Sequence, residues 1–218
     1  MKLKNKYLSI TCDGGAATGK STGAKLIAKK FNLSFLSSGL LYRYASYLIL
    51  KHTPKNELGF LKKKFKNLDY KKLTKINLHS PKISYQSAII AKKLGVRNIL
   101  KKYQINFIRT HKNCVLEGRD ASTKILPHSD VKFYFKCSLN IAAKRRYMEL
   151  KKKHGNVRLI TVKKALKQRN ILDKNRKHSP LKKHKNAVVV DTGKLNKQAM
   201  VAKMSKHIEN IIIKKYGN

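Results

Sequence analysis

The sequence predicts an α/β fold in which a five-stranded, mostly parallel β-sheet has helices on both of its faces. Short β-like runs alternate with longer stretches of helical spacing, a pattern that is typical of parallel sheets. The 218 residues suffice for one domain with an inserted segment. Hydrophobic residues make up 41% of the chain, which is enough for a core and excludes a chain that is disordered throughout.

The expected elements follow one another along the whole chain. The strands are short runs of β-branched or aromatic residues, such as YLSITC and AVVV, and they cover residues 7–12, 33–36, 114–116, 131–135 and 187–190. The helices show apolar residues at helical spacing, and they cover residues 19–31, 39–51, 140–151, 161–172 and 195–214.

Two stretches do not follow this alternation. Residues 53–112 contain prolines and glycines but no convincing strand, so we expect a mostly helical insertion there. Residues 153–186 carry arginines and many lysines before Pro180. They predict a basic helical hairpin or flap between two strands.

The charge of the chain is unusual. Lysine and arginine total 52 against 10 acidic residues, which gives a net charge of +42 and an attraction to polyanions. The lysines are scattered rather than gathered in a block, which favours a general surface role over a nucleic-acid-binding tail. Nucleic acid is therefore a conceivable but not an expected partner.

Apolar runs and cysteines bear on the location of the protein. No apolar run approaches the roughly 20 residues that a membrane-spanning helix needs, and no secretory signal is recognisable. Three widely spaced cysteines, Cys12, Cys114 and Cys137, form neither a disulfide framework nor a metal-ligand pair. We expect a cytoplasmic protein with no membrane partner, and a monomer because no apolar heptad is visible.

A phosphate-binding loop follows the first expected strand. The segment GGAATGKST, residues 14–22, matches G-x-x-x-x-G-K-[ST], with a strand before it and a helix after it. Such a loop directs backbone N–H groups and the positive end of a helix at phosphate oxygens. It predicts a P-loop NTPase core. The ATP-binding residues are Gly14, Gly15, Ala16, Ala17, Thr18, Gly19, Lys20, Ser21 and Thr22, with Lys20 on the outer phosphates and Ser21 as a ligand of Mg²⁺.

Arginines are few in this lysine-rich chain, so each of them is a modest signal for phosphate binding. Arg119 follows an expected strand directly, at the sheet edge where α/β sites lie. Arg169, Asp173 and Arg176 have helical spacing and lie on one face, as a binding face or as a surface salt-bridge ladder. Arg145 and Arg146 are about as compatible with a surface role as with a site.

Several segments together resemble the bacterial cytidylate kinases, which belong to the small nucleoside-monophosphate kinases. Apart from 52–77, where nothing matches, the resemblance covers nearly the whole chain. It rests on GGAATGKST (14–22), LSSGLLYR (36–43), LHSPKISYQSAIIAKKLGVRNIL (78–100), EGRDASTKILPHSD (117–130), QRNILDKNRKHSPL (168–181) and VVVDTGKL (188–195).

The resemblance implies that ATP phosphorylates CMP or dCMP to the diphosphate. It also implies one kinase domain, 1–218, with a monophosphate-binding insertion at about 37–112 and a lid at about 153–186. The catalytic residues would be Lys20, Arg43, Arg119 and Arg176. The substrate-binding residues would be Ser38, Gly39, Tyr42, Arg43, Arg97, Arg119, Asp120, Arg169 and Asp173.

Four positions depart from the pattern of the family. Ser37 replaces an aspartate, Ala88 a serine that touches the base, His79 an arginine, and Asn170 an acidic residue of the flap. We expect these changes to leave ATP binding alone and to alter selectivity for CMP. A kinase of UMP or AMP and a nucleic-acid-binding P-loop ATPase therefore remain alternatives.

Three acidic residues at strand ends leave two interpretations each. Asp13 either supports a metal site or caps a turn, and Glu117 either holds a metal-bound water or ends its strand in solvent. For Asp191 the favoured interpretation is a structural role, in packing on the nucleotide side or in helix capping. The eight histidines show no ligand spacing, so no zinc is expected.

Overall fold

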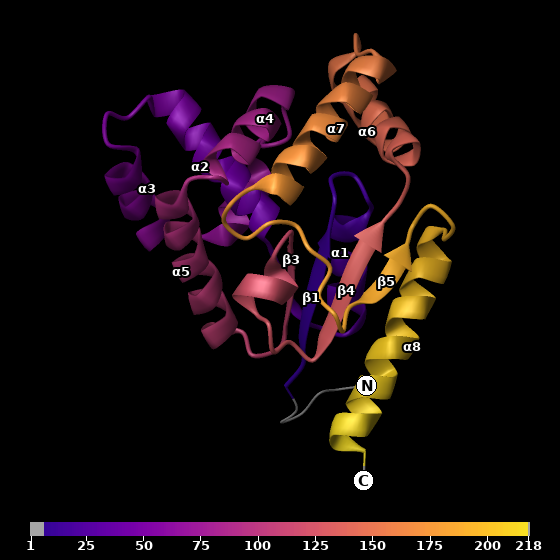
Figure 1. Cartoon of the computed structure of the whole chain (residues 1–218). Helices are drawn as coiled ribbons and strands as arrows, with labels where there is room; N and C mark the ends of the chain where they lie inside the picture. Colours follow the sequence, from indigo (N-terminus) through magenta and orange to yellow (C-terminus); the bar gives the residue numbers. More distant parts are fainter. Residues whose placement is uncertain (1–6, 218) are drawn as a thin grey trace.

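Five parallel strands form one sheet at the centre of the molecule, as the sequence predicts (Figure 1). The structure is a computed structural model, and it describes residues 7–217. Every strand pairing in this part of the chain is parallel. The order β2-β3-β1-β4-β5 combines β1 (Ser9–Gly14), β2 (Ser34–Ser37), β3 (Cys114–Gly118), β4 (Val131–Lys136) and β5 (Val188–Asp191).

The central position of β1 determines where a site can form. β1 pairs with β3 on one side and with β4 on the other, so that Asp13 lies opposite both Gly118 and Tyr134. The carboxyl ends of these strands therefore meet at one edge of the sheet. In open parallel sheets ligands bind at this edge, between neighbouring strands whose following connections pass to opposite faces of the sheet.

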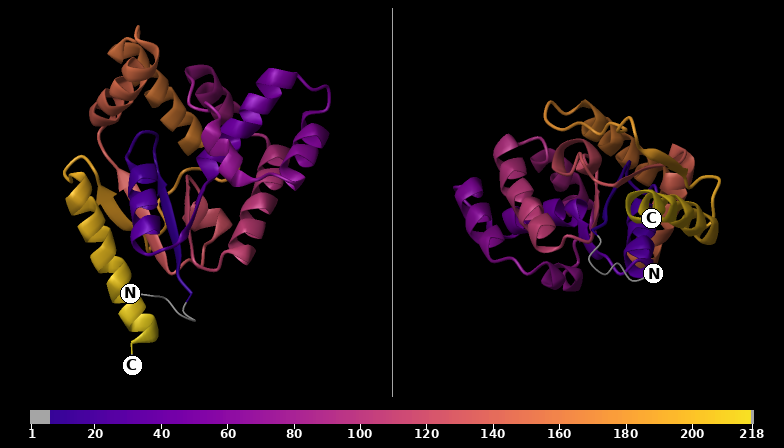
Figure 2. Two further views of the ribbon diagram at one scale, coloured as in Figure 1. Left: turned by 180° about the vertical axis from the view of Figure 1, so that it is seen from behind. Right: turned by 90° about the horizontal axis from the view of Figure 1, so that it is seen from below.

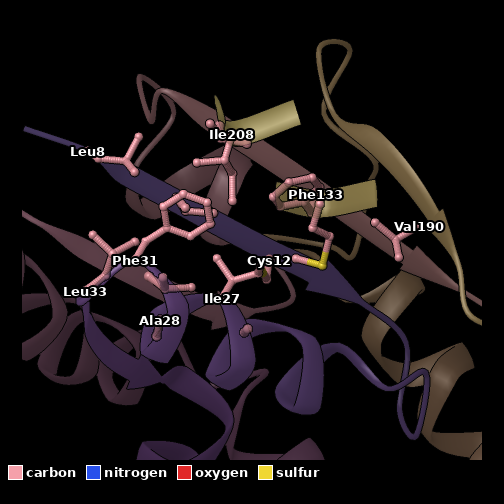
Figure 3. Close-up of a cluster of buried hydrophobic side chains, with 14 of the residues drawn as sticks. Leu8, Cys12, Ile27, Ala28, Phe31, Leu33, Phe133, Val190 and Ile208 are labelled. Atoms are coloured by element: carbon pink, nitrogen blue, oxygen red, sulfur yellow. The ribbon is translucent and has the colours of Figure 1, made fainter. Parts of the chain in front are cut away.

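One face of the sheet is covered by α1 (Lys20–Lys30) and α8 (Lys197–Tyr216). Their apolar side chains pack against alternate residues of β1 and β4, and each large side chain that is fully buried there contributes about 2 kcal/mol. Figure 3 shows this cluster, including Leu8, Cys12, Ile27, Ala28, Phe31, Leu33, Phe133, Val190 and Ile208.

On the other face of the sheet, β3 is covered by a helical turn and by one helix. Cys114 and Leu116 pack against the single π-helical turn η2 (Ala121–Ile125) and against α5 (Leu94–Thr110), whereas Val115, between them, belongs to the first cluster. This alternation is what a strand buried on both faces requires.

Helices fill the chain between β2 and β3, as expected for residues 53–112. They are α2 (Ser38–His52), α3 (Glu57–Lys66), the 3₁₀ helix η1 (Tyr70–Lys75), α4 (Pro81–Ile90) and α5. They share an apolar core of their own, to which α2, α3 and α5 contribute buried leucines. This group of helices is called the α2–α5 group below.

The helical hairpin consists of α6 (Leu139–His154) and α7 (Leu159–Asn175). It begins earlier than the stretch 153–186 in which it was expected. Alanines of α6 and apolar residues of α7 form one small core. Lysine is a good helix former, and α6 continues through its lysine run to residue 154. A segment without helix or strand, 176–187, then returns the chain to β5.

The hairpin lies above the carboxyl edge of the sheet, as do α2 and α4, with the phosphate loop between them (Figures 1 and 2). Within residues 7–217, no helix is both long and apolar enough for a membrane span. The arrangement leaves the carboxyl edge of the sheet as the place where three separate parts of the chain meet.

Candidate active site

The phosphate loop connects β1 to α1 in a conformation that two glycines make accessible. Gly14 has φ +155°, and a Cβ there would lie 2.5 Å from the carbonyl oxygen of Phe135. Gly19 has φ +79°, which L-residues with side chains rarely adopt. The loop therefore curls back over the end of the sheet, and Lys20 begins α1 directly behind it.

Lys20 is buried and forms an ion pair at the base of the loop. Its Nζ lies 3.0 Å from Oε1 of Glu117, at the end of β3, and 3.4 Å from the carbonyl oxygen of Gly15. The Ser37 hydroxyl donates to the other oxygen of Glu117. Glu117 is only 2% exposed, so it is not a strand end in solvent.

The two partners of this ion pair have altered pKa values. Burial and the nearby Arg119 lower the pKa of Lys20 from 10.5 to about 8, although Glu117 opposes this shift. Burial also disfavours the charged form of Glu117. Lys20, the Ser37 hydroxyl and Arg119 outweigh it, and they hold the pKa of Glu117 below its ordinary value.

A large cavity of about 1390 Å³ opens beside the loop. The loop residues from Ala16 to Thr22 line one side of it. Arg43 of α2, Arg119 after β3 and Arg169 of α7 line it as well. Arg145 and Arg146 of α6 also line it, so five guanidinium groups from distant parts of the chain share one cavity with the phosphate loop.

These arginines are held by polar contacts. Arg43 donates from one nitrogen to the Leu78 carbonyl oxygen at 3.1 Å and to the Ser84 hydroxyl at 2.5 Å. Burial, with Arg169 as the next cause, lowers the pKa of Arg43, and burial together with Arg119 lowers that of Arg169 to about 10. The cavity therefore carries more positive charge than its carboxylates neutralise, as an anion-binding site requires.

A chain of ion pairs continues behind the cavity. Nε of Arg119 donates to Asp173 at 2.9 Å, and Arg176 lies 3.6 Å from both Asp173 and Asp120. Asp120 also accepts from Arg97. Asp173 of α7 is buried, and so is Arg176, which follows the end of the helix instead of continuing its face, so these residues do not form a surface salt-bridge ladder.

Several of the residues predicted to be catalytic or substrate-binding do not line the large cavity. Tyr42, Arg97, Asp120, Asp173 and Arg176 belong to the ion-pair chain or lie next to it, and Tyr42 and Arg97 line a second cavity of about 670 Å³. Gly39 does line the large cavity.

Ser38 is the predicted residue that is least suited to touch a ligand here. Its hydroxyl is buried and donates to Oε1 of Gln104 at 2.5 Å. Both side chains are buried, so this hydrogen bond ties the start of α2 to α5. In this conformation the serine has a structural partner rather than a free hydroxyl in the cavity.

Arg145 and Arg146 of α6, for which the sequence leaves a surface role and a site role open, both line the large cavity. Arg145 donates to the hydroxyl and the carbonyl oxygen of Thr192, at 2.9 and 2.7 Å, and that hydroxyl donates to the Thr18 carbonyl oxygen at 2.8 Å. Arg146 donates to the carbonyl oxygen of His79 at 2.8 Å. The arginine pair and the D-T-G turn were visible in the sequence, but nothing there indicated that they meet.

The positions that depart from the family pattern lie around the cavity. Ser37, His79 and Ala88 line it, on the side of the α2–α5 group. Asn170 contacts the phosphate loop instead, because its side-chain oxygen accepts a hydrogen bond from the backbone N–H of Ala16 at 3.1 Å. Asn170 thus lies on α7, with its side chain against the phosphate loop.

Two further acidic residues have structural roles. Asp13 accepts hydrogen bonds from the backbone of Ala121 and Ser122 and from the Ser122 hydroxyl, at 2.9, 2.7 and 2.6 Å. It therefore caps the turn η2, and burial raises its pKa to about 6. Asp191 accepts from the Gly193 N–H at 3.0 Å and shapes the turn after β5.

The donor set fits a magnesium ion that is held mainly by phosphates. Ser21 and Glu117 both line the cavity with oxygen ligands beside the phosphate loop. Among residues 7–217 there is no cluster of three or more histidine, cysteine or acidic side chains that could hold a metal alone. Magnesium commonly binds through one or two protein oxygens, water and substrate phosphates, so Ser21 remains suitable.

The fold and this site define a P-loop kinase: a phosphate loop follows the central strand, and arginines surround the cavity in front of it. A model of the cytidylate kinase family matches residues 10–210. The chain belongs to the cytidylate kinase family, whose members are nucleoside-monophosphate kinases.

Individual relatives agree with this assignment. A cytidylate kinase of Clostridium tetani is 36% identical over 219 residues, which cover 95% of this chain and 96% of that protein. A cytidylate kinase of Bartonella tribocorum is 37% identical over 212 residues, covering 95% and 97%.

Solved structures show the fold alone. An uncharacterised protein from Eubacterium ventriosum matches with a TM-score of 0.54 and 15% identity, over 93% of this chain and 98% of that one. A protein from Thermus thermophilus matches with a TM-score of 0.52 and 15% identity, over 94% and 97%.

Proposed function

We propose that this protein transfers the terminal phosphate of ATP to CMP and dCMP, giving ADP and the nucleoside diphosphate. The observation that carries the proposal is the single cavity in which the phosphate loop faces Arg43, Arg119 and Arg169. Two polyanions repel each other, so a site that joins them needs cations on both sides of the reacting phosphate. Family membership supports the choice of substrate.

The phosphate loop is the proposed donor side. Backbone N–H groups of the loop and the start of α1 bind the phosphates of ATP. When ATP binds, Lys20 exchanges its partner Glu117 for phosphate oxygens. Its ammonium group can reach them because the Lys20–Glu117 pair lies at the base of the loop. Bound magnesium, held by Ser21 and the phosphates, supplies further positive charge.

The arginines are the proposed acceptor side. Arg43 and Arg119 hold the phosphate of CMP so that one of its oxygens attacks the γ-phosphorus in line. The bond between that phosphorus and the bridging oxygen of ADP then breaks. No strong base is needed, because the attacking oxygen is already ionised.

The ion-pair chain has a proposed role in orienting the acceptor. Arg119 keeps its direction through Asp173, and Arg176 joins Asp173 to Asp120. We infer from the resemblance to the family that Asp120, on the G-R-D turn, helps to recognise the cytosine, that Arg169 and Asp173 contact the ribose, and that Arg97 and Arg176 contact phosphate. For these contacts to form, the ligand must replace some of the ion pairs within the ion-pair chain.

The two helical groups are the proposed moving parts. Residues 37–112 would bind the monophosphate, and residues 153–186 would close over both nucleotides as a lid. Closure excludes water from the γ-phosphate and so limits hydrolysis of ATP. Arg146, which bridges the hairpin to His79, supports a closed arrangement.

A substrate panel tests the proposal. Formation of ADP from Mg²⁺-ATP is measured with CMP, dCMP, UMP and AMP in turn, and we expect CMP and dCMP to give the highest kcat/KM. Lys20→Ala should lower kcat by orders of magnitude, because a charge that stabilises the transition state is lost. Preference for UMP or AMP would change the substrate, and no turnover with any monophosphate would refute the proposal.

The same panel includes the nucleic-acid alternative, which the net charge of +42 motivates. If duplex DNA or RNA stimulates ATP hydrolysis and no monophosphate is phosphorylated, a nucleic-acid-dependent ATPase is the better description. A cytoplasmic location and a monomeric state are part of the proposal, and gel filtration with light scattering tests the latter.

A further inference from the structure

One side chain of α7, Asn170, contacts the phosphate loop. Its Oδ1 accepts from the Ala16 N–H at 3.1 Å, and a Cβ at Gly15 would lie only 3.2 Å from the same oxygen. Ala16 is also buried in the small apolar core of the α6–α7 hairpin. The hairpin therefore holds the tip of the loop by a polar and an apolar contact.

The neighbouring residue, Arg169, contacts the other side of the cavity. It donates from one guanidinium nitrogen to the Ser87 hydroxyl of α4 at 3.4 Å. Ser87 donates to the Ser84 carbonyl oxygen at 2.8 Å, and Arg43 donates to the Ser84 hydroxyl at 2.5 Å. Consecutive contacts thus run from α7 through α4 to Arg43 of α2.

Residues 169 and 170 are adjacent on one helix, so they move together. A shift of α7 that brings Arg169 toward a ligand on the acceptor side also changes the position of Asn170 at the loop. Nε of Arg169 is buried and has no hydrogen-bond partner among the described residues, so Arg169 gains from a ligand oxygen that meets it.

We propose that Asn170 is a positioning residue through which α7 couples the binding of ATP to the binding of the monophosphate. This proposal rests on the proposed function of the two sides of the cavity. Asn170 acts through the loop: its amide oxygen fixes the Ala16 N–H, and Arg169 links that position to the acceptor side. Such coupling is reciprocal, so each nucleotide raises the affinity for the other by the same factor.

The chemistry of the amide suits this role. The hydrogen bond to the Ala16 N–H needs an acceptor, which an amide oxygen and a carboxylate both provide. A carboxylate adds a negative charge beside the loop that receives phosphates, whereas the amide adds none. The presence of a hydrogen-bond acceptor at residue 170 should therefore determine the coupling. A negative charge at this residue should change the affinity for ATP equally with and without the monophosphate.

Calorimetry tests this proposal. A non-hydrolysable ATP analogue with Mg²⁺ is titrated into the full chain, with and without saturating CMP. In the wild type we expect CMP to raise the affinity for the analogue by about fivefold or more. In Asn170→Ala the factor should fall close to unity, while CMP binds the enzyme without analogue as tightly as it binds the wild type.

Two variants separate coupling from general damage. Asn170→Asp keeps an acceptor for the Ala16 N–H and should keep the coupling factor within about twofold of the wild type, even where the analogue binds more weakly. Asn175→Ala changes an exposed asparagine in the last turn of the same helix and should change neither affinity nor coupling. Circular dichroism and thermal unfolding check that each variant is folded.

The outcomes distinguish this proposal from the proposed function. Wild-type coupling in Asn170→Ala, or loss of coupling in Asn170→Asp, would overturn the role of Asn170. So would a wild type in which CMP leaves the analogue affinity unchanged. If CMP does not bind the wild type at all, the proposed substrate is wrong, and the coupling is measured with the monophosphate that the substrate panel identifies.

Discussion

At the scale of single residues, Lys20 gives the site a pH dependence. Its pKa is about 8, because it is buried and faces Arg119. Above this pH the ammonium loses its proton and its attraction to phosphate. We expect kcat/KM for ATP to be flat in the neutral range and to fall above pH 8, measured as a pH profile with a buffer series of constant ionic strength. A profile that stays flat through pH 9.5, about 1.5 units higher, would contradict this pKa.

Removing the carboxylate beside Lys20 shifts that profile. Glu117 stabilises the charged form of Lys20 and so raises its pKa. Glu117→Gln should therefore move the alkaline fall to lower pH. The matched control is Glu57→Gln, which removes the α3 carboxylate that pairs with Lys93, the residue before α5. Its profile should coincide with that of the wild type.

Arg43 belongs to the acceptor side, and its loss should affect the monophosphate more than ATP. A hydrogen bond to a charged group contributes about 1.5–3 kcal/mol, so Arg43→Ala should raise KM for CMP about tenfold or more, with a smaller change for ATP. Steady-state kinetics with each substrate varied measures this. Arg109→Ala, an exposed arginine of α5 outside the cavity, is the control. An unchanged KM and kcat for CMP in Arg43→Ala would refute this role.

At the scale of elements, Asp13 fixes the turn η2 to the end of β1. It accepts three hydrogen bonds from Ala121 and Ser122 in a buried place. Asp13→Ala leaves these donors unsatisfied and should lower the free energy of unfolding by about 2 kcal/mol or more, measured by urea denaturation. Asp69→Ala removes a comparable but exposed cap of η1 and should cost less than about 1 kcal/mol. Equal losses in both variants would contradict the argument.

The elements differ in how far the sequence predicts them. The five strands follow from short runs rich in apolar and β-branched residues, because the central strands of a parallel sheet are buried on both faces. The helix expected at 140–151 is present as α6, but no local pattern indicates that it is the first arm of the hairpin, which is expected only from residue 153. Its length depends on packing between α6 and α7, which no local pattern contains.

The site shows the same limit. The phosphate loop is contiguous in the sequence, so its residues could be identified directly. The contact of Asn170 with Ala16 joins residues 154 positions apart, and that of Arg145 with Thr192 joins residues 47 apart. Ser38 matches the motif of the family, yet its hydroxyl bonds to Gln104. Which way a side chain points is decided by tertiary neighbours rather than by the motif.

At the scale of the whole molecule, the acidic residues are distributed unevenly. Of the ten in the chain, Asp13, Glu117, Asp120 and Asp173 are buried at the carboxyl edge of the sheet. There they pair with arginines, with Lys20 or with backbone N–H groups. The remaining surface is consequently even more basic than the composition alone indicates, and its charges repel one another.

This repulsion predicts how salt affects the protein. Raising NaCl from 0.1 to 1 M shortens the screening length from about 10 Å to about 3 Å, so repulsion among surface lysines weakens. We expect Tm, measured by scanning calorimetry, to rise by about 3 °C for each kcal/mol of repulsion removed.

KM for ATP should rise over the same salt range, because screening also weakens the attraction between the site and a polyanion. Stability and nucleotide binding should thus respond to salt in opposite directions. KCl should give the same curves as NaCl, since screening depends on ionic strength rather than on the cation. A Tm that falls with salt would mean that the surface charges are already compensated in the folded protein, and the net charge of +42 would then not limit its stability.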